Sequence, residues 1–366
     1  MTQPQAATPA PEKPGHAARR LALPGGFSLP QSGFLGQARQ GGIIYPFIVL
    51  FVVLTIWKGS LFADRTNLLE ILDQQASYLI IAAAGTMVMI AGGIDLSVGA
   101  TYALCQVIAT KMAEGGNPVL AIVVGVLVGV GVGAVNGVIA TFFRINSLIA
   151  TLAMSFVITG VASLVTNGNL IIAYSALGFA NFARTEFLDV TTAAWTMIGV
   201  VIIFGIVLSR TIAGRYMYAA GSNAEAARLA GVRVQWIKLV TFAISGGAAG
   251  LGGIIDASRV LSASSQNGGT ALTFTVLAGI VVGGTSILGG SGAIWRTFMG
   301  VLFIAIIGNG FTLLAWNPLY EQNTLGVILL LAVGGDAWSR LRTTYRRYRP
   351  PTGPRSSANV RWFTFT

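Results

Sequence analysis

Charged side chains are rare in this sequence. Lys, Arg, Asp and Glu make up 10% of its 366 residues, whereas an ordinary soluble domain carries about 25%. So few charges cannot cover the surface of a water-soluble globule of this length. The single cysteine, Cys105, excludes an intrachain disulfide. The sequence also lacks G-x-x-x-x-G-K-[ST], and none of its four lysines follows a glycine, which excludes a P-loop nucleotide site.

The sequence consists largely of long apolar runs. Hydrophobic residues make up 54% of the chain, in runs such as Val119–Phe143 and Trp195–Leu208, and about 20 mostly apolar residues cross the hydrocarbon core of a bilayer. The pattern predicts an all-α, polytopic membrane protein with ten transmembrane helices. The expected spans are 43–62, 76–92, 96–112, 118–141, 147–166, 193–210, 239–257, 271–290, 293–315 and 323–339.

The basic residues divide unequally between the two sides of this layout. Ten crossings place both termini on one side, and most of the Lys and Arg fall there, which predicts cytoplasmic termini. This asymmetry accounts for the net charge of +11 without a nucleic-acid partner. The opposite side receives only Lys58, Arg65, Lys111, Arg184 and Arg259.

The layout divides the chain into three parts. Residues 1–42 are rich in Pro, Gly, Ala and Gln and lack a signal-peptide run, so we expect a disordered, basic cytoplasmic tail. Residues 43–339 form the transmembrane domain, which includes a cytoplasmic loop at 210–238. Residues 340–366 form a second basic cytoplasmic tail.

Four glycines recur at every fourth position within the expected span 118–141. This spacing puts them on one helical face, where the lack of side chains lets a second helix approach closely in lipid. The embedded GVGVGA also matches a loose dinucleotide fingerprint, but it lies inside an unbroken apolar helix rather than after a strand. Packing is therefore the favoured interpretation for Gly125, Gly129, Gly133 and Gly137.

A carboxylate, Asp95, interrupts the apolar sequence in AGGIDLSVGA. An ionised aspartate at the centre of a membrane costs roughly 2.5–3.5 kcal/mol. We expect it to cap a half-helix after a break, by accepting a bond from the N–H of Ser97 or Val98, with the broken helix lining a path. A direct substrate or proton site is the less favoured alternative.

The sequence GGTSILGGSGA at 283–293 resembles GGIDLSVGA at 92–100. Each motif separates two hydrophobic arms, in its own half of the chain. Paired glycine-interrupted spans of this kind point to a transport pathway built from repeats, although chance glycine richness remains the alternative. Residues expected at the pathway or the broken helices are Gly93, Asp95, Ser97, Gln75, Asn136, Thr273, Phe274, Gly284 and Asn309.

The loop at 210–238 contains a short helix-forming sequence, NAEAARLAG. Asn223 suits the N-cap, Glu225 suits the positive end of the helix dipole, and Gly231 suits the left-handed position after the helix. A capped helix held between two spans is suited to being pushed or pulled by a cytoplasmic partner. The predicted contact residues are Gly221, Asn223, Ala224, Glu225, Ala226, Ala227, Arg228, Leu229, Ala230 and Gly231.

With these motifs in place, the chain resembles the permease subunits of monosaccharide ABC importers of the ribose, xylose and galactose branch. The resemblance covers residues 43–339. It is carried by GIDLSVGA with the preceding helix (65–100), INSLIATLAM with TNG (145–168), GRYMYAAGSNAEAARLAGVRVQWIK (214–238) and VVGGTSILGGSGAI (281–294).

The resemblance implies an importer of a neutral monosaccharide or similar polyol across a bacterial inner membrane. A second permease subunit, identical or paralogous, would complete the pathway, and two ATPase subunits would dock on the helix near Ala227. A soluble sugar-binding protein would deliver the solute from outside. No cofactor is expected on this chain itself, because the ATPases would bind and hydrolyse Mg-ATP, and the chain is not expected to be an enzyme.

One departure from the family concerns the segment before GGTS. Many members carry a Glu and an Asp there, where this chain has Thr270, Thr273, Phe274 and Thr275. The resemblance therefore does not indicate which sugar is carried. Two other functions remain open: a branched-chain amino acid ABC permease and an ion-coupled secondary transporter, the latter requiring a titrating acid such as Asp95.

Overall fold

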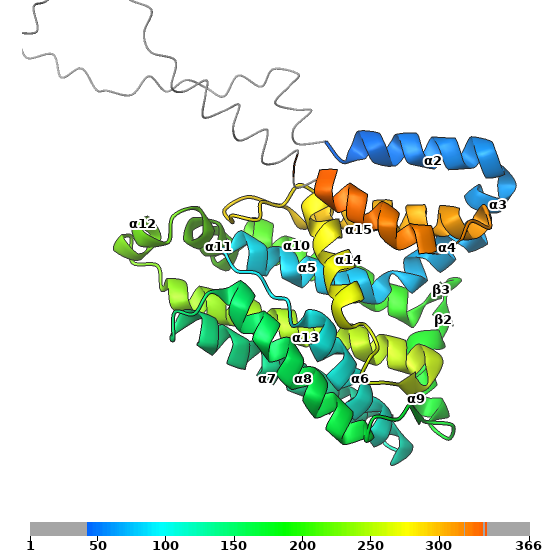
Figure 1. Cartoon of the computed structure of the whole chain (residues 1–366), viewed down its shortest axis with the longest axis horizontal. Helices are drawn as coiled ribbons and strands as arrows, with labels where there is room; N and C mark the ends of the chain where they lie inside the picture. The colour runs from blue at the N-terminus through cyan, green and yellow to red at the C-terminus, as the bar shows by residue number, and fades with distance from the viewer. Residues whose placement is uncertain (1–41, 318, 332–333, 335–366) are drawn as a thin grey trace, which may run out of the picture. The chain divides into compact units, whose positions relative to one another are not determined.

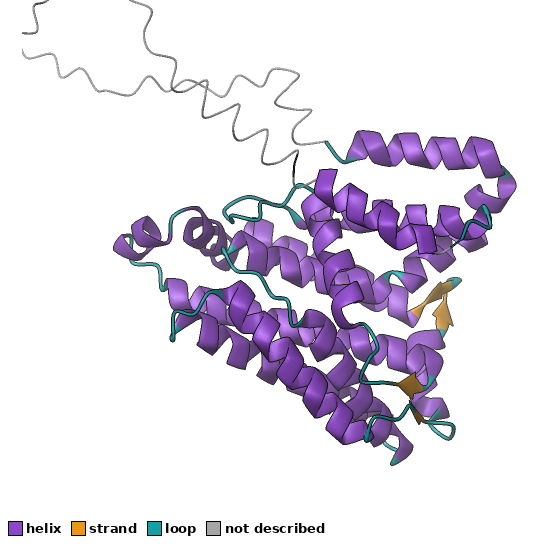
Figure 2. Cartoon of the chain, viewed as in Figure 1, coloured by secondary structure: helices purple, strands orange, loops and turns teal. Residues whose placement is uncertain are grey.

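The computed structural model describes residues 42–317, 319–331 and 334. Most of these residues are helical (Figures 1 and 2). The expected tails at 1–41 and 340–366 lie outside the described residues. The first half comprises α2 (Ile44–Lys58), α3 (Ser60–Ala63), α4 (Arg65–Gln74), α5 (Ala76–Ile90), α6 (Val98–Glu114), α7 (Pro118–Thr141) and α8 (Ser147–Thr166).

The second half combines long and short helices. Residues 319–331 form a last helical segment. The elements are α9 (Leu177–Arg184), α10 (Thr192–Arg210), α11 (Ile212–Ser222), α12 (Ala224–Leu229), α13 (Val234–Val260), α14 (Gly269–Val282) and α15 (Ile294–Leu313).

Two short antiparallel strand pairs join helices at one end of the bundle. β1 (Ile171–Ile172) pairs with β4 (Ser262–Ala263), and β2 (Glu186–Phe187) pairs with β3 (Val190–Thr191). Figure 2 shows both pairs beside the loops at that end. Within the described part of the chain, sheet is therefore a minor addition to a helical protein.

Within the part of the chain that the structure describes, five helices are long and apolar enough to cross a membrane, namely α7, α8, α10, α13 and α15. The helices α2, α5 and α14 are shorter and also apolar. In each of α7, α8 and α10, 22% of the residues in the most apolar stretch are buried inside the protein. In α13 the buried share is 61%. Apolar side chains that face outward in such numbers are suited to lipid or to another membrane subunit. The chain is a multi-pass membrane protein.

Two predicted spans are ended or broken by a glycine in the structure, and α13 begins at Val234, five residues before the expected span 239–257. The expected span 271–290 ends at Val282, because Gly284 adopts a left-handed φ of 79° and ends the helix. The expected span 43–62 is broken at Gly59, which has a positive φ of 57° and separates α2 from α3. Both errors have one cause: the apolar sequence continues through a glycine that turns the backbone.

The long helix α13 lies at the centre of the bundle and packs against α5, α6, α7 and α9. The glycines of α7 face it at backbone contact. A Cβ added to Gly129 would lie 2.4 Å from the carbonyl oxygen of Gly246, and one added to Gly133 would lie 2.2 Å from that of Phe242. The other two glycines of the set, Gly125 and Gly137, also lie against α13.

The glycines of α13 form a second set of close approaches, which the sequence analysis did not single out. A Cβ added to Gly253 would lie 2.3 Å from the carbonyl oxygen of Tyr102 on α6, and one added to Gly252 would lie 3.1 Å from Ile81 on α5. The signal is visible in SGGAAGLGG at 245–253, where small residues occupy several faces of one helix. As a result, α13 can pack closely against three helices at once.

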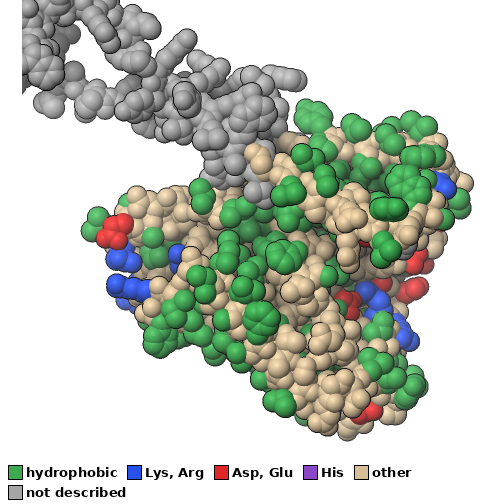
Figure 3. Space-filling view, viewed as in Figure 1, with side chains coloured by type: hydrophobic (Ala, Val, Ile, Leu, Met, Phe, Trp, Pro, Cys, Tyr) green, Lys and Arg blue, Asp and Glu red, His purple; other side chains and the backbone are tan. Residues whose placement is uncertain are grey.

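Charged side chains gather at two opposite ends of the described bundle (Figure 3). One end carries α12 with its ion pair between Arg228 and Glu225. The other carries Arg65 paired with Asp189, and Arg259 paired with both Asp73 and Asp256. The face between them shows mainly apolar and uncharged side chains. This distribution suits a protein whose middle lies in lipid and whose ends lie in water.

Candidate functional site

The first break lies between α5 and α6, and Asp95 is its central polar group. Asp95 is 6% exposed. One carboxylate oxygen accepts hydrogen bonds from the Ser97 N–H (3.0 Å) and the Ser97 hydroxyl (2.6 Å), and the other accepts one from Ser245 on α13 (2.8 Å). The expected bond from the Ser97 N–H is present, but the helix begins at Val98, two residues later than predicted.

The loop around Asp95 is also held from α7 and α8. Asn136 on α7 donates to the Ser97 hydroxyl (2.7 Å), while Ser147 and Thr151 on α8 accept from the N–H groups of Ile94 and Leu96. Side chains thus satisfy backbone groups that the interrupted helix leaves without partners. Gly93 belongs to the same loop and packs against Phe242 of α13.

The hollow beside Asp95 is too small for a solute. The hollow that it lines with Gly93 measures only about 10 Å³, which is roughly the volume that one water molecule needs. In this conformation Gly93, Asp95, Ser97 and Asn136 therefore build the broken helix rather than an open passage.

The second break, between α14 and α15, has the same backbone geometry as the first. Gly92 follows the end of α5 with φ 78°, and Gly284 follows the end of α14 with φ 79°. In each case the next N–H bonds to a carbonyl five residues earlier: Gly93 to Val88, and Thr285 to Ile280. Both helices therefore end in the same glycine-dependent motif.

The two breaks meet at one point, which we call the glycine junction: Ile90, Gly92, Gly221, Gly289 and Gly290. The Gly290 N–H donates to the Ile90 carbonyl at 2.9 Å, which joins the second break directly to the end of α5. A Cβ added to Gly221 would lie 1.8 Å from the same carbonyl oxygen, and one added to Gly289 would lie 2.9 Å from the Gly92 Cα. Three backbone segments are therefore in direct contact.

Side chains reinforce the glycine junction from α11 and α13. The Tyr218 hydroxyl donates to the Gly292 carbonyl at 2.8 Å, and the Lys238 ammonium donates to the Gly92 carbonyl at 3.3 Å. Burial raises the pKa of the Tyr218 hydroxyl above its usual value, so it remains a protonated donor at neutral pH. The sequence analysis missed Tyr218 and Lys238, since nothing along the chain links them to the glycine motifs.

The predicted loop helix is present as α12, directly beyond the glycine junction. The Asn223 side chain accepts from the N–H groups of Glu225 (3.1 Å) and Ala226 (3.0 Å). Gly231 follows the helix with φ 85°, and Leu229 is 83% exposed. The segment also contains α11, which was not predicted. Gly221 lies in the last turn of α11, which ends at Ser222, and Asn223 caps α12, so only two residues separate the glycine junction from the start of α12.

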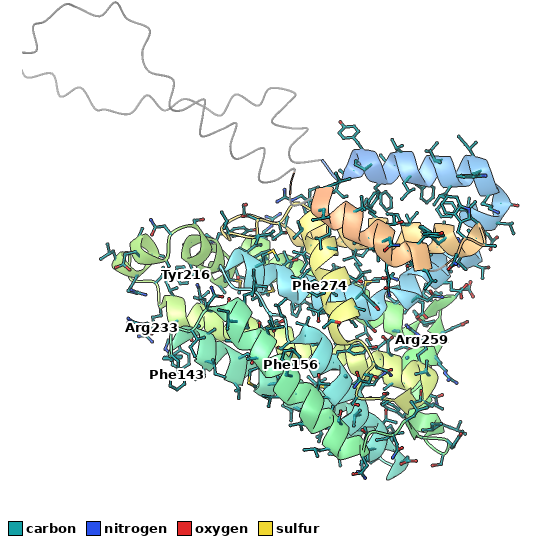
Figure 4. All side chains as sticks on the ribbon, in the orientation of Figure 1. Phe143, Phe156, Tyr216, Arg233, Arg259 and Phe274 are labelled. Atoms are coloured by element: carbon teal, nitrogen blue, oxygen red, sulfur yellow. The ribbon has the colours of Figure 1, made fainter. Side chains whose placement is uncertain are left out.

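A groove runs along α14 on the outer surface of the bundle. Phe274 on α14 and Phe156 on α8 both lie on the face seen in Figure 4, and they border a hollow of about 290 Å³ that also reaches Leu96. A second hollow, of about 480 Å³, shares Thr270 and Phe274 with the first. None of the residues that line either hollow is charged.

Thr273 belongs to the same groove but makes structural bonds. Its hydroxyl accepts from the Gly99 N–H at 3.1 Å and donates to the Gly269 carbonyl at 2.9 Å. These bonds hold the start of α6 against the start of α14. Thr273 therefore supports the wall of the groove, and Phe274 faces out of it with 53% exposure.

Gln75 and Asn309 lie together in another hollow, of about 420 Å³, bounded by α4, α5, α15 and residues 319–331. Asn309 exchanges two amide hydrogen bonds with Asn67 of α4, at 2.8 and 3.3 Å. The nine predicted pathway residues therefore occupy four places: the buried first break, the second break with Gly284, the groove along α14, and this polar hollow.

Substitution of Asp95 distinguishes a structural carboxylate from a proton carrier. Asp95→Asn keeps an acceptor for Ser97 and a polar partner for Ser245, so we expect any transport activity to fall less than tenfold. Asp95→Ala leaves the buried donors unpaired and is expected to lower the free energy of unfolding by about 1–3 kcal/mol. Uptake assays and thermal unfolding in detergent measure the two effects. Complete loss of uptake in a stably folded Asp95→Asn variant would indicate proton coupling.

Comparison with known proteins agrees with a membrane-embedded transport subunit. Residues 67–333 match the family described as "Branched-chain amino acid transport system / permease component". The Bacillus subtilis ribose import permease protein RbsC is 36% identical over 302 residues, covering 82% of this chain and 93% of that protein. The Azospirillum brasilense L-arabinose ABC transporter permease protein AraH is 33% identical over 339 residues, covering 92% and 96%. No solved structure matches.

These matches define the class of the protein as a permease subunit of an ABC importer, which is a transport component and not an enzyme. The chain belongs to the matched permease family. The resemblance identified from GIDLSVGA, GGTSILGG and the loop helix is therefore confirmed. A further relative, the D-allose transport system permease protein AlsC of Escherichia coli, is 31% identical over 296 residues.

Proposed function

We propose that this chain translocates a neutral monosaccharide or similar polyol across the bacterial inner membrane, with both termini in the cytoplasm. Separate ATPase subunits bind α12 and supply Mg-ATP hydrolysis, and an extracytoplasmic binding protein delivers the solute. Relatives named as ribose, arabinose and allose permeases support a sugar as the solute. The observation that carries the mechanism is the glycine junction, because it connects α11 and α12 to both broken helices.

The mechanism follows from these contacts. When the ATPases close on ATP, they displace α12, whose Asn223 cap and Gly231 turn keep it a rigid body. Gly221 transmits the displacement to Ile90 and Gly290, so the ends of α5 and α14 move together. The loops that follow carry Leu96 and the start of α6, which border the groove at Phe274. The groove then opens alternately to the two sides.

A second permease subunit completes the pathway in this proposal. The groove along α14 is open on one side, and its exposed wall combines Phe274, Phe156 and uncharged hydroxyl and amide groups. A second copy or a paralogue packed on this face would enclose the groove. Sugars exchange hydrogen bonds with such neutral groups without requiring a countercharge. An amino acid zwitterion would require charges that the groove lining lacks.

Transport by the assembled complex tests the proposal. The permease is reconstituted with its ATPase and binding protein in proteoliposomes, and uptake of labelled D-ribose, L-arabinose, D-allose and L-leucine is compared with and without ATP. ATP-dependent uptake of at least one sugar is the expected result. Uptake of leucine alone would favour an amino acid permease, and sugar uptake without ATP would favour a secondary transporter.

Substitutions in α12 test its coupling role. Glu225→Arg removes the ion pair with Arg228, which measures 3.0 Å, and places a positive charge at the positive end of the helix dipole. Gly231→Pro fixes φ near −65° where the chain needs 85°, and it removes the N–H that bonds to the Arg228 carbonyl.

Both variants are expected to insert into the membrane normally and to reduce uptake by about tenfold or more, since the first reverses a charge on the proposed contact surface and the second strains the turn by roughly 1–3 kcal/mol. Uptake per ATP hydrolysed is the quantity to measure. The matched control is Glu114→Arg, which makes the same change at an exposed residue at the C-terminal end of α6. Uptake at the wild-type level in both α12 variants would contradict a coupling role for this helix.

A further inference from the structure

The hollow bounded by α4, α5, α15 and residues 319–331 has a polar lining at a position where most of the bundle is apolar. Its volume of about 420 Å³ lies within the 300–1,000 Å³ range of small-molecule sites. Amide, hydroxyl and carboxylate groups of Gln75, Tyr78, Asn309 and Glu321 face it, and a second carboxylate, that of Glu70, accepts from Gln74 on the same wall. We call it the outer polar cavity.

Several polar groups in the outer polar cavity have unused hydrogen-bonding capacity. Among the described residues, no hydrogen bond occupies the Gln75 amide or the Tyr78 hydroxyl, and no cation pairs with the Glu321 carboxylate. Gln75 precedes α5 as its N-cap but makes no side-chain cap bond. A solute with adjacent donors and acceptors could therefore engage all three side chains at once.

The backbone around Glu321 is shaped to hold its carboxylate at the cavity wall. A Cβ added to Gly308 of α15 would lie 2.8 Å from a Glu321 carboxylate oxygen, so the absence of a side chain makes room for this group. The paired amides of Asn67 and Asn309 lock α4 to α15 beside it. The acceptor is thus positioned by rigid elements rather than by a loop.

The outer polar cavity adjoins the groove along α14. Thr275 and Leu325 line both the cavity and the neighbouring hollow of about 480 Å³, which in turn shares Thr270 and Phe274 with the next hollow. The three hollows therefore follow one another along α14 from Glu321 toward Leu96. The expected topology places Glu321 and α4 on the extracytoplasmic side.

We propose that the outer polar cavity binds the vicinal hydroxyls of a polyol as it enters, with the Glu321 carboxylate as acceptor and Gln75 and Tyr78 completing the contact. This assignment rests on the proposed function and places a solute-binding site within one permease subunit. A carboxylate accepts from two neighbouring hydroxyls with charge-assisted hydrogen bonds, which are stronger than bonds between neutral groups. Amides on the same wall add donors and acceptors.

Protection of an introduced thiol tests this site. The one native thiol, Cys105, is buried at 0% exposure, so labelling of the intact complex by a maleimide has little background. Thr312→Cys places a thiol on the cavity wall without removing a proposed ligand, because Thr312 bonds only to its own helix. Glu186→Cys, in a separate hollow of about 600 Å³, is the control position. Thr275→Cys serves as the reporter if Thr312→Cys does not assemble.

D-ribose, added without ATP, is expected to slow labelling of Thr312→Cys several-fold and to leave Glu186→Cys unchanged. Adding Glu321→Gln to the reporter should raise the ribose concentration needed for protection about tenfold, the equivalent of about 1.4 kcal/mol, because a neutral amide oxygen accepts a weaker hydrogen bond than a carboxylate does. L-lysine should not protect, because the cavity is assigned to hydroxyls rather than to a cationic group.

Three outcomes would overturn the site: no labelling of either reporter, labelling that ribose does not slow, or protection by lysine but not by ribose. If the same complex still imports ribose with ATP, only the site assignment fails. If no sugar is imported in the presence of ATP, the proposed function itself fails, whatever the thiol shows. The two failures are therefore distinguishable.

Discussion

Gly129→Leu and Gly133→Leu are expected to prevent stable assembly of the helix bundle, whereas Gly131→Leu on the same helix is expected to be tolerated. A Cβ alone would lie 2.4 Å from a carbonyl oxygen at Gly129 and 2.2 Å from one at Gly133, and it would meet nothing within 4 Å at Gly131. Since α13 is the central helix, a forced separation of α7 from α13 also displaces the buried Asn136–Ser97 bond.

The size of this effect follows from the contact distances. Adding methylenes to a packed core commonly costs about 1–3 kcal/mol, and a leucine at backbone contact should exceed that range. The measurement is the yield of monodisperse protein in detergent together with its thermal midpoint. Equal thermal midpoints for Gly129→Leu and Gly131→Leu would show that α7 does not need glycines on the face that packs against α13.

Gly221→Ala is the second substitution with a large expected effect, and it acts on coupling. A Cβ at Gly221 would lie 1.8 Å from the Ile90 carbonyl oxygen and 2.7 Å from the Gly290 nitrogen. Neither is a flexible side chain, so α11 must move away from both breaks. Alanine favours a helix by about 1 kcal/mol over glycine, so any loss arises from the glycine junction and not from the helix itself.

We expect Gly221→Ala to reduce ATP-driven uptake about tenfold to a hundredfold, the kinetic equivalent of roughly 1–3 kcal/mol of overpacking. ATP hydrolysis by the complex should persist, because α12 and its contact surface are unchanged. Gly205→Ala on α10, where a Cβ meets nothing within 4 Å, is the matched control. Wild-type uptake per ATP in Gly221→Ala would show that the junction does not transmit the motion.

Tyr218→Phe provides a milder test of the same junction. It removes the hydroxyl that donates to the Gly292 carbonyl at 2.8 Å and leaves the ring in place. The expected loss in coupling is a few-fold, because one neutral hydrogen bond contributes about 0.5–1.5 kcal/mol. An effect on protein yield without an effect on uptake per ATP would assign Tyr218 to folding alone.

Predictions that depend on residues close together in the sequence succeeded more often than predictions that depend on contacts between distant residues. α12 was predicted from Asn223 and Gly231, and the structure shows this cap and this turn, because capping is decided within a few residues. The end of α14 was misplaced by eight residues for a related reason. Hydropathy continues through Gly283 and Gly284, and the left-handed turn there is stabilised by contacts that composition does not record.

The candidate site could be predicted only in part. Gly93, Asp95 and Ser97 are close in sequence and were grouped correctly, but their partner Ser245 lies 150 residues away. Gln75 and Asn309 were chosen as neutral polar residues in an apolar context, and nothing in the sequence placed them together. Glu321 and Tyr78 were not chosen at all, since their relation arises from the packing of the last helical segment on α15 and α5.

The sequence by itself determined that this chain is a multi-pass permease with short motifs that break and cap helices, because hydropathy and local backbone preferences act over a few turns. Only the tertiary structure decided that Gly221, Ile90 and Gly290 meet, and that polar side chains from four segments surround one cavity. These contacts form only where helices pack with their backbones touching. That packing depends on the shapes of helix surfaces whose residues lie far apart along the chain.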